Sequence, residues 1–143
     1  MIDRFDVSQF KTRFACQIPS YDPKNFSALS IKEARSTDLF SQFAIIAADE
    51  AVKDSKLDLD KVGAIIGSSV GGISTMEHEF KDYVEGEQPR FSPYMIPKFI
   101  TNIASGLIAI KYGFRGPNYC ITSACATSAH ALTQACMEIK SGR

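Results

Sequence analysis

The sequence has no surplus of charge and no long apolar run. It carries 16 basic and 16 acidic residues, giving a formal net charge of +0 at pH 7. Such a chain has no global charge with which to hold nucleic acid or an anionic membrane. No apolar run is long enough to span a bilayer, and the opening MIDRFDVSQF lacks the apolar core of a signal peptide. We therefore expect a soluble cytoplasmic protein without nucleic-acid or membrane partners.

The sequence also lacks a recognisable metal, disulfide or phosphate motif. Its four cysteines stand at 16, 120, 125 and 136, without the C-x-x-C spacing of a zinc site or a secreted disulfide framework. The segment GSSVGG at 67–72 lacks the Gly-Lys-Ser/Thr ending of a P-loop and the spacing of a dinucleotide fingerprint. Its glycines instead predict close backbone packing against another element. We expect neither a metal nor an organic cofactor.

The length of 143 residues suits one domain, and its hydrophobic pattern predicts helices alternating with strands. Helices are predicted over 37–54, 73–84 and 100–112, and from Cys125 to about 140. The apolar run 62–66 is typical of a buried parallel strand, and 118–121 predicts a second strand. Residues 1–30 read as irregular, with apolar side chains that we expect to anchor them to the core: Phe5, Phe10, Phe14, Ile18 and Phe26.

Helical spacing predicts which faces of these helices are buried. In the helix 37–54, for which Ser36 or Thr37 is the expected cap, the predicted buried stripe comprises Leu39, Phe43, Ile46 and Ala47. In the last helix it comprises Ala129, Leu132, Cys136 and Ile139. A small-residue surface for close packing is predicted in the helix 100–112 at Ala104, Ser105, Gly106 and Ala109.

A predicted strand, a tight turn and a helix meet at Cys125. Small residues flank it, as a nucleophile on a sharp strand-to-helix turn requires. A helix beginning there points backbone N–H groups and the positive end of its dipole at the sulfur, which favours the thiolate. The residues alone leave two interpretations open, a reactive nucleophile and a small buried apolar side chain.

Neither histidine is an obvious base for Cys125. His130 follows Cys125 by five residues. That separation is a rotation of roughly 140° along a helix, so we expect His130 to point away from the sulfur. His78 lies on another predicted helix, with nothing in the sequence to direct it towards Cys125. A cysteine hydrolase, which needs such a base, is therefore disfavoured.

The segment TSACATSAHAL, after the lead-in YGFRGPNYCI, resembles the active-site segment of the β-ketoacyl-acyl carrier protein synthases. Four upstream segments resemble the elongating type II synthases in order and spacing: RFDVSQFKTRFA, KEARSTDLFSQFAIIAADEA, VGAIIGSSVGGI and SPYMIPKFITNIASG. The resemblance implies an α/β protein of the thiolase-like αβαβα layered fold, with residues 1–143 forming an incomplete first half, a partial N-terminal ketosynthase domain. It also implies that Cys125 is the catalytic nucleophile.

The implied reaction is a decarboxylative Claisen condensation of an acyl-enzyme thioester with malonyl-acyl carrier protein in fatty acid elongation. The implied partners are an acyl carrier protein, fatty acyl and malonyl thioesters, and a second copy of the chain in a homodimer. A polyketide ketosynthase or another thiolase-like acyltransferase is an alternative, as is an inactive fragment with a structural or binding role. Motifs that follow position 143 in the family supply two histidines and a lysine, so we expect this chain alone not to complete the condensation.

The resemblance assigns roles to further residues. An acyl tunnel is implied whose lining comes from Val70 and Ala124 of one protomer and from Met95, Ile96 and Phe99 of the other. Lys32, Arg35 and Arg90 are implied docking points for an acidic carrier protein, with a solvated charged surface as the plain alternative.

Overall fold

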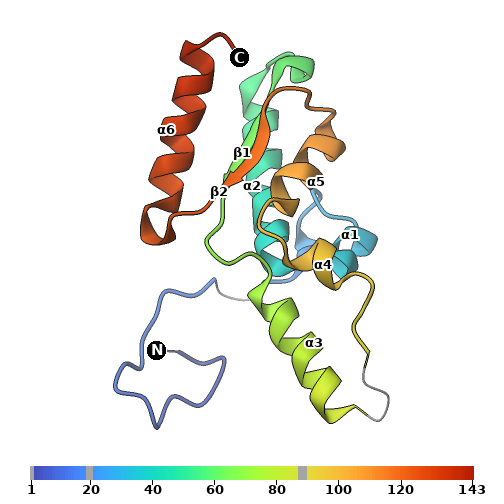
Figure 1. The fold of residues 1–143 in the computed structure, drawn as a ribbon, viewed down its shortest axis with the longest axis vertical. Helices are drawn as coiled ribbons and strands as arrows, with labels where there is room; N and C mark the ends of the chain where they lie inside the picture. Colours follow the sequence, from blue (N-terminus) through green and yellow to red (C-terminus); the bar gives the residue numbers. More distant parts are fainter. Residues whose placement is uncertain (1, 19–20, 87–89) are drawn as a thin grey trace.

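The computed structural model describes residues 2–18, 21–86 and 90–143. Figure 1 shows the arrangement of the helices and the strands. The helices are α1 (Ile31–Ser36), α2 (Leu39–Ser55), α3 (Ile73–Glu85), α4 (Met95–Phe99), α5 (Ile103–Tyr112) and α6 (Thr127–Lys140). The strands are β1 (Ala64–Gly67) and β2 (Asn118–Ile121), and short 3-10 turns cover Pro23–Asn25, Leu59–Lys61 and Ala124–Ala126.

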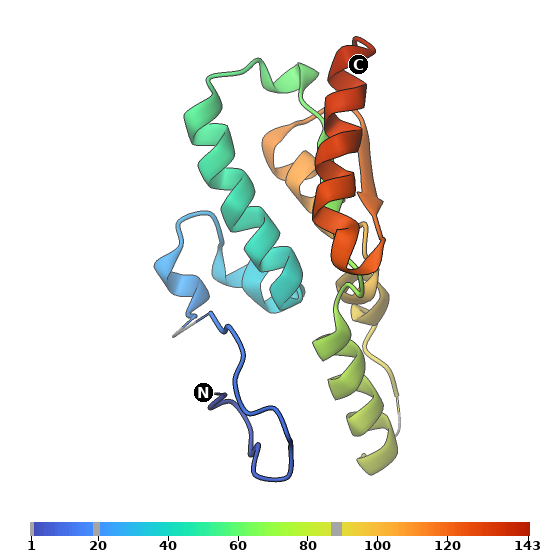
Figure 2. The same ribbon diagram turned by 90° about the vertical axis from the view of Figure 1, so that its left-hand side faces the viewer.

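The two strands pair in parallel, from Ala64 beside Asn118 to Gly67 beside Ile121. Parallel neighbours need a long crossover, and here it contains α3, α4 and α5. Helix α6 packs on one side of the strands, whereas α5 packs on the other side with α2 beyond it (Figures 1 and 2). This layering confirms the predicted α/β class and both strands, which the sequence placed to within two residues.

The core lies between the strands, α5 and α2. Its fully buried apolar members are Ala28, Leu29, Ile45, Ala64 and Ile108. Ala104 and Ser105 on α5 are completely buried, as the prediction of close packing requires, whereas Gly106 on the same helix borders open space. The small-residue surface is therefore confirmed at Ala104 and Ser105 and is wrong at Gly106.

The helix predicted over 37–54 is α2, and a further helix that was not predicted, α1, precedes it. Ser30 starts α1 with a capping box, in which its hydroxyl accepts from the Glu33 amide and Glu33 accepts from the Ser30 amide. Asp38, rather than Ser36 or Thr37, caps α2 by accepting from the Phe40 amide. Helix α4 was also not predicted, because Pro97 and its short length give no helical period. It leaves α5 beginning at Ile103 instead of Ile100.

The expected anchoring of the N-terminal segment is wrong. Phe5, Phe10, Phe14 and Ile18 are between 49% and 75% exposed. The described residues before 19 form an irregular loop that lies apart from the layers in both ribbon views (Figures 1 and 2). Phe26 alone among the five is half-buried, where its ring stacks against Tyr21. The apolar character of these side chains makes them suited to burial, but it does not show whether any other element packs against them.

The predicted buried face of α6 is wrong, and that of α2 is confirmed only in part, because Ile46 packs against the core. On α2 the buried residues are Ser41, Gln42 and Ile45, while the expected stripe has Leu39 and Ala47 exposed and Phe43 and Ile46 half-buried. On α6 the buried residues are Thr127, Ala131 and Glu138, whereas all of Ala129, Leu132, Cys136 and Ile139 are exposed. In both helices hydrogen bonds allow polar side chains to occupy the packed face: Gln42 donates to the carbonyls of Ala34 and Thr37, and Glu138 accepts from the Tyr119 hydroxyl.

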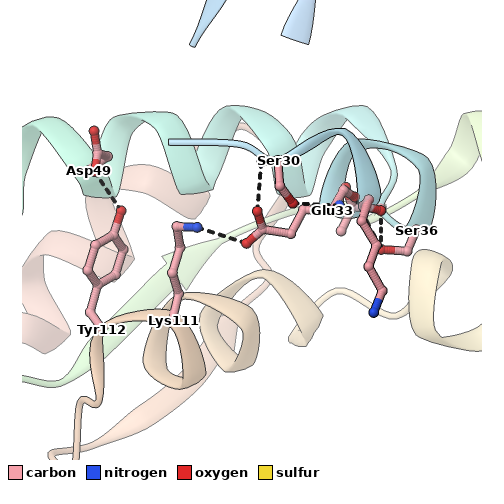
Figure 3. Close-up of polar contacts among 8 residues, drawn as sticks. Ser30, Glu33, Ser36, Asp49, Lys111 and Tyr112 are labelled. Carbon is pink, nitrogen blue, oxygen red and sulfur yellow. Dashed lines mark hydrogen bonds and ion pairs between the residues drawn. The ribbon is translucent and has the colours of Figure 1, made fainter. Parts of the chain in front are cut away.

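Two polar contacts join α5 to α1 and α2 (Figure 3). Lys111 Nζ lies 2.8 Å from Glu33 Oε1, and the Tyr112 hydroxyl donates to Asp49 Oδ1 at 2.9 Å. Burial opposes ionisation of Glu33, but the hydrogen bonds from Lys111 and Ser30 outweigh it and lower the pKa of Glu33 to about 2. Burial and the bond to Asp49 raise the pKa of Tyr112. The Glu33 contact thus holds α1 only while the carboxylate is ionised.

The Glu33–Lys111 contact predicts an acid-dependent loss of stability. The pKa of Glu33 is about 2 in the folded chain, below its ordinary value of about 4.3. Its stabilisation is therefore present above pH ~4.3 and declines as the pH falls towards 2. Lys111→Met should lower the free energy of unfolding by about 1 kcal/mol at pH 7, a figure kept small because solvent screens a partly exposed pair. The difference from wild type should shrink between pH ~4.5 and 3 in urea titrations.

Lys61→Met is the matched control, because Lys61 and Asp58 form a more exposed ion pair at 3.6 Å. This variant should change the free energy of unfolding little at any pH. A Lys111→Met difference that stays constant from pH 7 to 3 would contradict the role assigned to Glu33.

Candidate functional site

Two loops meet where the parallel strands end. The loop 68–72 follows β1, and the turn that carries Cys125 follows β2. Because the carboxyl ends of parallel strands share an edge, these segments lie side by side. The Ser68 amide donates to the Ile121 carbonyl at 3.2 Å, and the Thr122 hydroxyl donates to the Ser68 carbonyl at 2.8 Å. The sheet thus places the glycine-rich loop against the turn that bears the cysteine.

The turn itself is strained. Cys125 is the middle residue of the 3-10 turn Ala124–Ala126, and α6 begins at Thr127, two residues later than predicted. Ala124 has a φ of +46°, in the left-handed region that costs an L-residue about 1 kcal/mol or more. Lys56, the other described non-glycine residue with positive φ, ends α2, where this conformation is common. Strain of this kind concentrates at functional sites, and here it immediately precedes an exposed Cys125.

Hydroxyl groups from both sides hold this turn. Ser69 Oγ donates to the Ala124 carbonyl at 3.0 Å and lies 3.1 Å from Thr127 Oγ1. Thr127 Oγ1 in turn accepts from the Ser123 amide at 2.9 Å. Sequence reasoning did not single out these hydroxyls for any role. The available signal was their position on both sides of a predicted sharp turn, where serine and threonine side chains satisfy exposed backbone groups.

The glycines of the 67–72 loop allow the close packing that was predicted for them. A Cβ on Gly67 would lie 2.7 Å from Thr127 Cγ2, and one on Gly71, whose φ is +69°, would lie 2.2 Å from the Phe99 carbonyl oxygen. The Gly72 amide donates to that same carbonyl at 3.0 Å. The loop is therefore held between the Cys125 turn on one side and the end of α4 on the other.

This packing determines where the predicted tunnel residues lie. Val70 is 52% exposed in the middle of the loop, and Ala124 is exposed in the adjoining turn. Met95 and Phe99 on α4 are half-buried, and Ile96 is 57% exposed. Val70 stands in the loop between Ser69, which bonds to the Ala124 carbonyl, and Gly71, which packs against Phe99 at the end of α4.

Neither histidine bonds to the cysteine. His130 Nδ1 lies 2.7 Å from Ser123 Oγ, and His78 Nδ1 lies 2.6 Å from the Ser74 carbonyl oxygen. Both histidines are exposed. The hydrogen bonds found among the described residues therefore provide no histidine partner for the thiol of Cys125. This agrees with the direction expected for His130 from its helical position.

A profile of the family described as "Beta-ketoacyl synthase, N-terminal domain" matches residues 3–143. The chain belongs to this family. It is 37% identical to a 3-oxoacyl-[acyl-carrier-protein] synthase 2 of Synechocystis sp. over 99% of its length, and 38% identical to that of Coxiella burnetii over 94%. It spans 35% and 33% of these two relatives.

Solved structures give the same fold. One is a type II polyketide acyl-carrier protein in complex with its ketosynthase, bound to the hexaketide. It matches with a TM-score of 0.73 and 25% sequence identity, and the match covers 86% of this chain and 36% of that chain. The ishigamide ketosynthase/chain length factor matches with a TM-score of 0.72 and 21% identity over 87% of this chain and 36% of that one. The elements described here are thus part of the thiolase-like ketosynthase fold, as the sequence resemblance implied.

The basic residues proposed from the ketosynthase resemblance lie on the surface. Lys32 and Arg35 are exposed on α1, and Arg90 is exposed beyond α3. The ion pairs of the described part of the chain do not include any of the three. The Glu33–Lys111 contact anchors the helix that carries Lys32 and Arg35 (Figure 3).

The described residues were also compared with the requirements of a metal site and of a membrane-spanning helix. Among residues 2–18, 21–86 and 90–143, no group of three or more His, Cys, Asp or Glu side chains is arranged to hold a metal ion. None of the described helices combines the length and the apolar character needed to cross a membrane.

The geometry of the turn predicts that Cys125 is the most reactive cysteine. Cys16, Cys125 and Cys136 are all exposed, so exposure alone does not separate them. Cys125 lies in the turn before α6, next to the backbone N–H groups that have no partner within the helix, whereas Cys136 lies inside that helix. Limiting iodoacetamide followed by peptide mass spectrometry should label Cys125 first. Faster labelling of Cys16, Cys120 or Cys136 would contradict this prediction.

Proposed function

We propose that this chain supplies the nucleophile of a 3-oxoacyl-acyl carrier protein synthase in fatty acid elongation. The observation that carries the proposal is the exposed Cys125 on a strained strand-to-helix turn, in a chain of the β-ketoacyl synthase family. The relatives at 37% and 38% identity are named as such synthases. Because the chain spans only about a third of their length, the activity is proposed for the protein to which these residues contribute.

The first step transfers an acyl group to Cys125. The thiolate attacks the carbonyl carbon of an acyl carrier-protein thioester, a new C–S bond forms, and the carrier thiol leaves as its thiolate. Thioesters suit this exchange because a thiolate is both a good nucleophile and a good leaving group. The Cys125 amide, at the first turn before α6, is proposed as one of two donors to the developing oxyanion. Such a donor typically lowers the barrier by about 3 kcal/mol.

The second step forms the carbon–carbon bond. A malonyl thioester loses carbon dioxide, and the resulting carbanion attacks the carbonyl carbon of the Cys125 thioester. The C–S bond to Cys125 then breaks, so that the thiolate is regenerated and the lengthened 3-oxoacyl group stays on the carrier protein. The two described histidine contacts lie at Ser123 and Ser74, so neither histidine is assigned to the decarboxylation.

Partners and location follow from the same proposal. An acidic acyl carrier protein would dock at Lys32, Arg35 and Arg90, whose exposure leaves them accessible. Homodimer formation would use β2, since in the described two-stranded sheet β2 pairs only with β1 and one of its edges is left without a strand partner. No proline or lysine within β2 blocks such pairing. We expect the proposed enzyme to act in the cytoplasm on carrier-bound thioesters.

A second candidate function is polyketide chain extension. It is favoured by the 25% identical structure of a type II polyketide carrier protein with its ketosynthase. The higher identity to the fatty acid synthases makes it the lesser candidate. Comparing acyl transfer to Cys125 from fatty acid and polyketide carrier proteins separates the two.

Acyl transfer to Cys125 is the direct test of the proposal. Incubation of the protein to which these residues contribute with an acyl carrier-protein thioester should add the mass of one acyl group to the peptide that contains Cys125. Cys125→Ala should abolish this addition, while Cys136→Ala, which removes another exposed thiol of the same region, should leave it unchanged. Acylation that is absent, or that persists in Cys125→Ala, would contradict the proposed function.

Val70 is proposed as the residue that limits acyl chain length. Its loop neighbours contact the Cys125 turn and the end of α4, so a larger side chain at Val70 would shorten the acyl pocket that we propose beside this loop. Each methylene excluded from such a pocket forfeits about 0.8 kcal/mol. Val70→Phe should therefore slow acylation by long acyl chains while leaving transfer of a two-carbon group nearly intact.

Val84→Phe is the matched control for this test, because Val84 is 77% exposed near the far end of α3. It should leave the preference for chain length unchanged. If Val70→Phe and wild type have the same ratio of short-chain to long-chain acylation rates, Val70 does not line the acyl pocket.

A further inference from the structure

The hydrogen bond between His130 and Ser123 links α6 to the turn before Cys125. His130 Nδ1 lies 2.7 Å from Ser123 Oγ, two residues before the cysteine. We propose that His130 is a positioning residue, which through Ser123 holds the strained turn in the conformation that presents the Cys125 thiol. The inference rests on the proposed role of Cys125 as the nucleophile. It gives His130 a structural role, since His130 bonds to Ser123 and not to the thiol.

The backbone of the turn needs external support. Ser123 has φ −156° and ψ 48°, and Ala124 has a φ of +46°. Residues in sparsely populated conformations persist only where the surrounding contacts hold them. Ser69 holds the Ala124 carbonyl from the β1 side, and Thr127 accepts from the Ser123 amide. Both contacts engage the backbone, which leaves the Ser123 side chain to His130.

Helix geometry explains why His130 reaches Ser123. Thr127 and His130 are three residues apart on α6, so they lie on the same face of the helix. Helical side chains lean towards the N-terminus, which directs both towards the residue that precedes the turn. Helix α6 therefore holds Ser123 at two points, the amide through Thr127 and the hydroxyl through His130.

These two contacts fix the position of the Cys125 turn relative to the sheet. Thr127 is buried against Gly67, the last residue of β1, where no Cβ could be accommodated. The start of α6 is consequently fixed relative to β1, and Ser123 is fixed relative to α6. His130 is itself exposed, so its contribution lies in this hydrogen bond and not in the packing of the core.

The ratio of alkylation rates at Cys125 and Cys136 tests the inference. Both thiols are exposed and Cys136 lies on α6, so a general disruption of that helix would also change the Cys136 rate. With iodoacetamide as the probe, Ser123→Ala and His130→Phe should each lower the Cys125 to Cys136 ratio about fivefold, an effect of the size expected from one ordinary hydrogen bond. The double variant should show no further loss, because both substitutions remove the same interaction.

Two conservative variants and a variant of the other histidine serve as controls for this test. Ser123→Thr retains the hydroxyl, and His130→Asn retains a polar atom near the position of Nδ1, so both should keep the ratio close to that of wild type. His78→Phe removes an exposed histidine whose Nδ1 lies 2.6 Å from the Ser74 carbonyl oxygen, away from the turn, and should have no effect.

An unchanged ratio in His130→Phe, additive losses in the double variant, or an equal loss in His130→Asn would overturn the positioning role. Alkylation does not require a carrier protein or an acyl substrate. If the variants show this pattern but the protein to which these residues contribute accepts no acyl group, the proposed function is refuted while the role of His130 is supported.

Discussion

The parallel pairing of β1 with β2 is the constraint on which the candidate site depends. Because the strands run in the same direction and in register, Gly67 ends beside Ile121, and the two following loops begin at the same edge. The hydroxyls of Ser69 and Thr122 then join loops that are more than fifty residues apart in the sequence. An antiparallel pairing would put these loops at opposite edges, and the Cys125 turn would lose its support from the β1 side.

The same pairing explains why small residues are concentrated at this edge. Gly67 has no space for a Cβ because Thr127 occupies it, and a Cβ on Gly71 would lie even closer to the carbonyl oxygen of Phe99. Side chains there would separate α6, the loop and α4. The strained conformation of Ala124 is held by this compact arrangement. Its contacts are hydrogen bonds of backbone and hydroxyl groups rather than large apolar contacts. The conformation of the turn that carries Cys125 is thus linked to the packing of three elements.

Helix α6 shows how polar groups can direct packing. Its buried face carries Glu138, whose carboxylate accepts from the Tyr119 hydroxyl at 2.7 Å and lies 3.0 Å from Arg143. A buried carboxylate is tolerated only where such partners offset the loss of hydration. The hydrogen bond selects the side of α6 that meets β2, and the more apolar side, with Leu132 and Ile139, remains on the surface of the described chain. Hydrophobic spacing alone gives the opposite result.

The amino-acid sequence by itself determined the local features of this protein. Continuous apolar runs located β1 and β2, Gly113 with its positive φ ended α5, and the small residues around Cys125 identified the turn and the family. Each of these depends on a short stretch of chain. The tertiary structure decided what depends on distant partners: the buried faces of α2 and α6, the exposure of the N-terminal phenylalanines, and the contacts of Ser69 and His130 with the turn. Periodicity records which side chains can be buried, but only the placement of neighbouring elements determines which of them are covered.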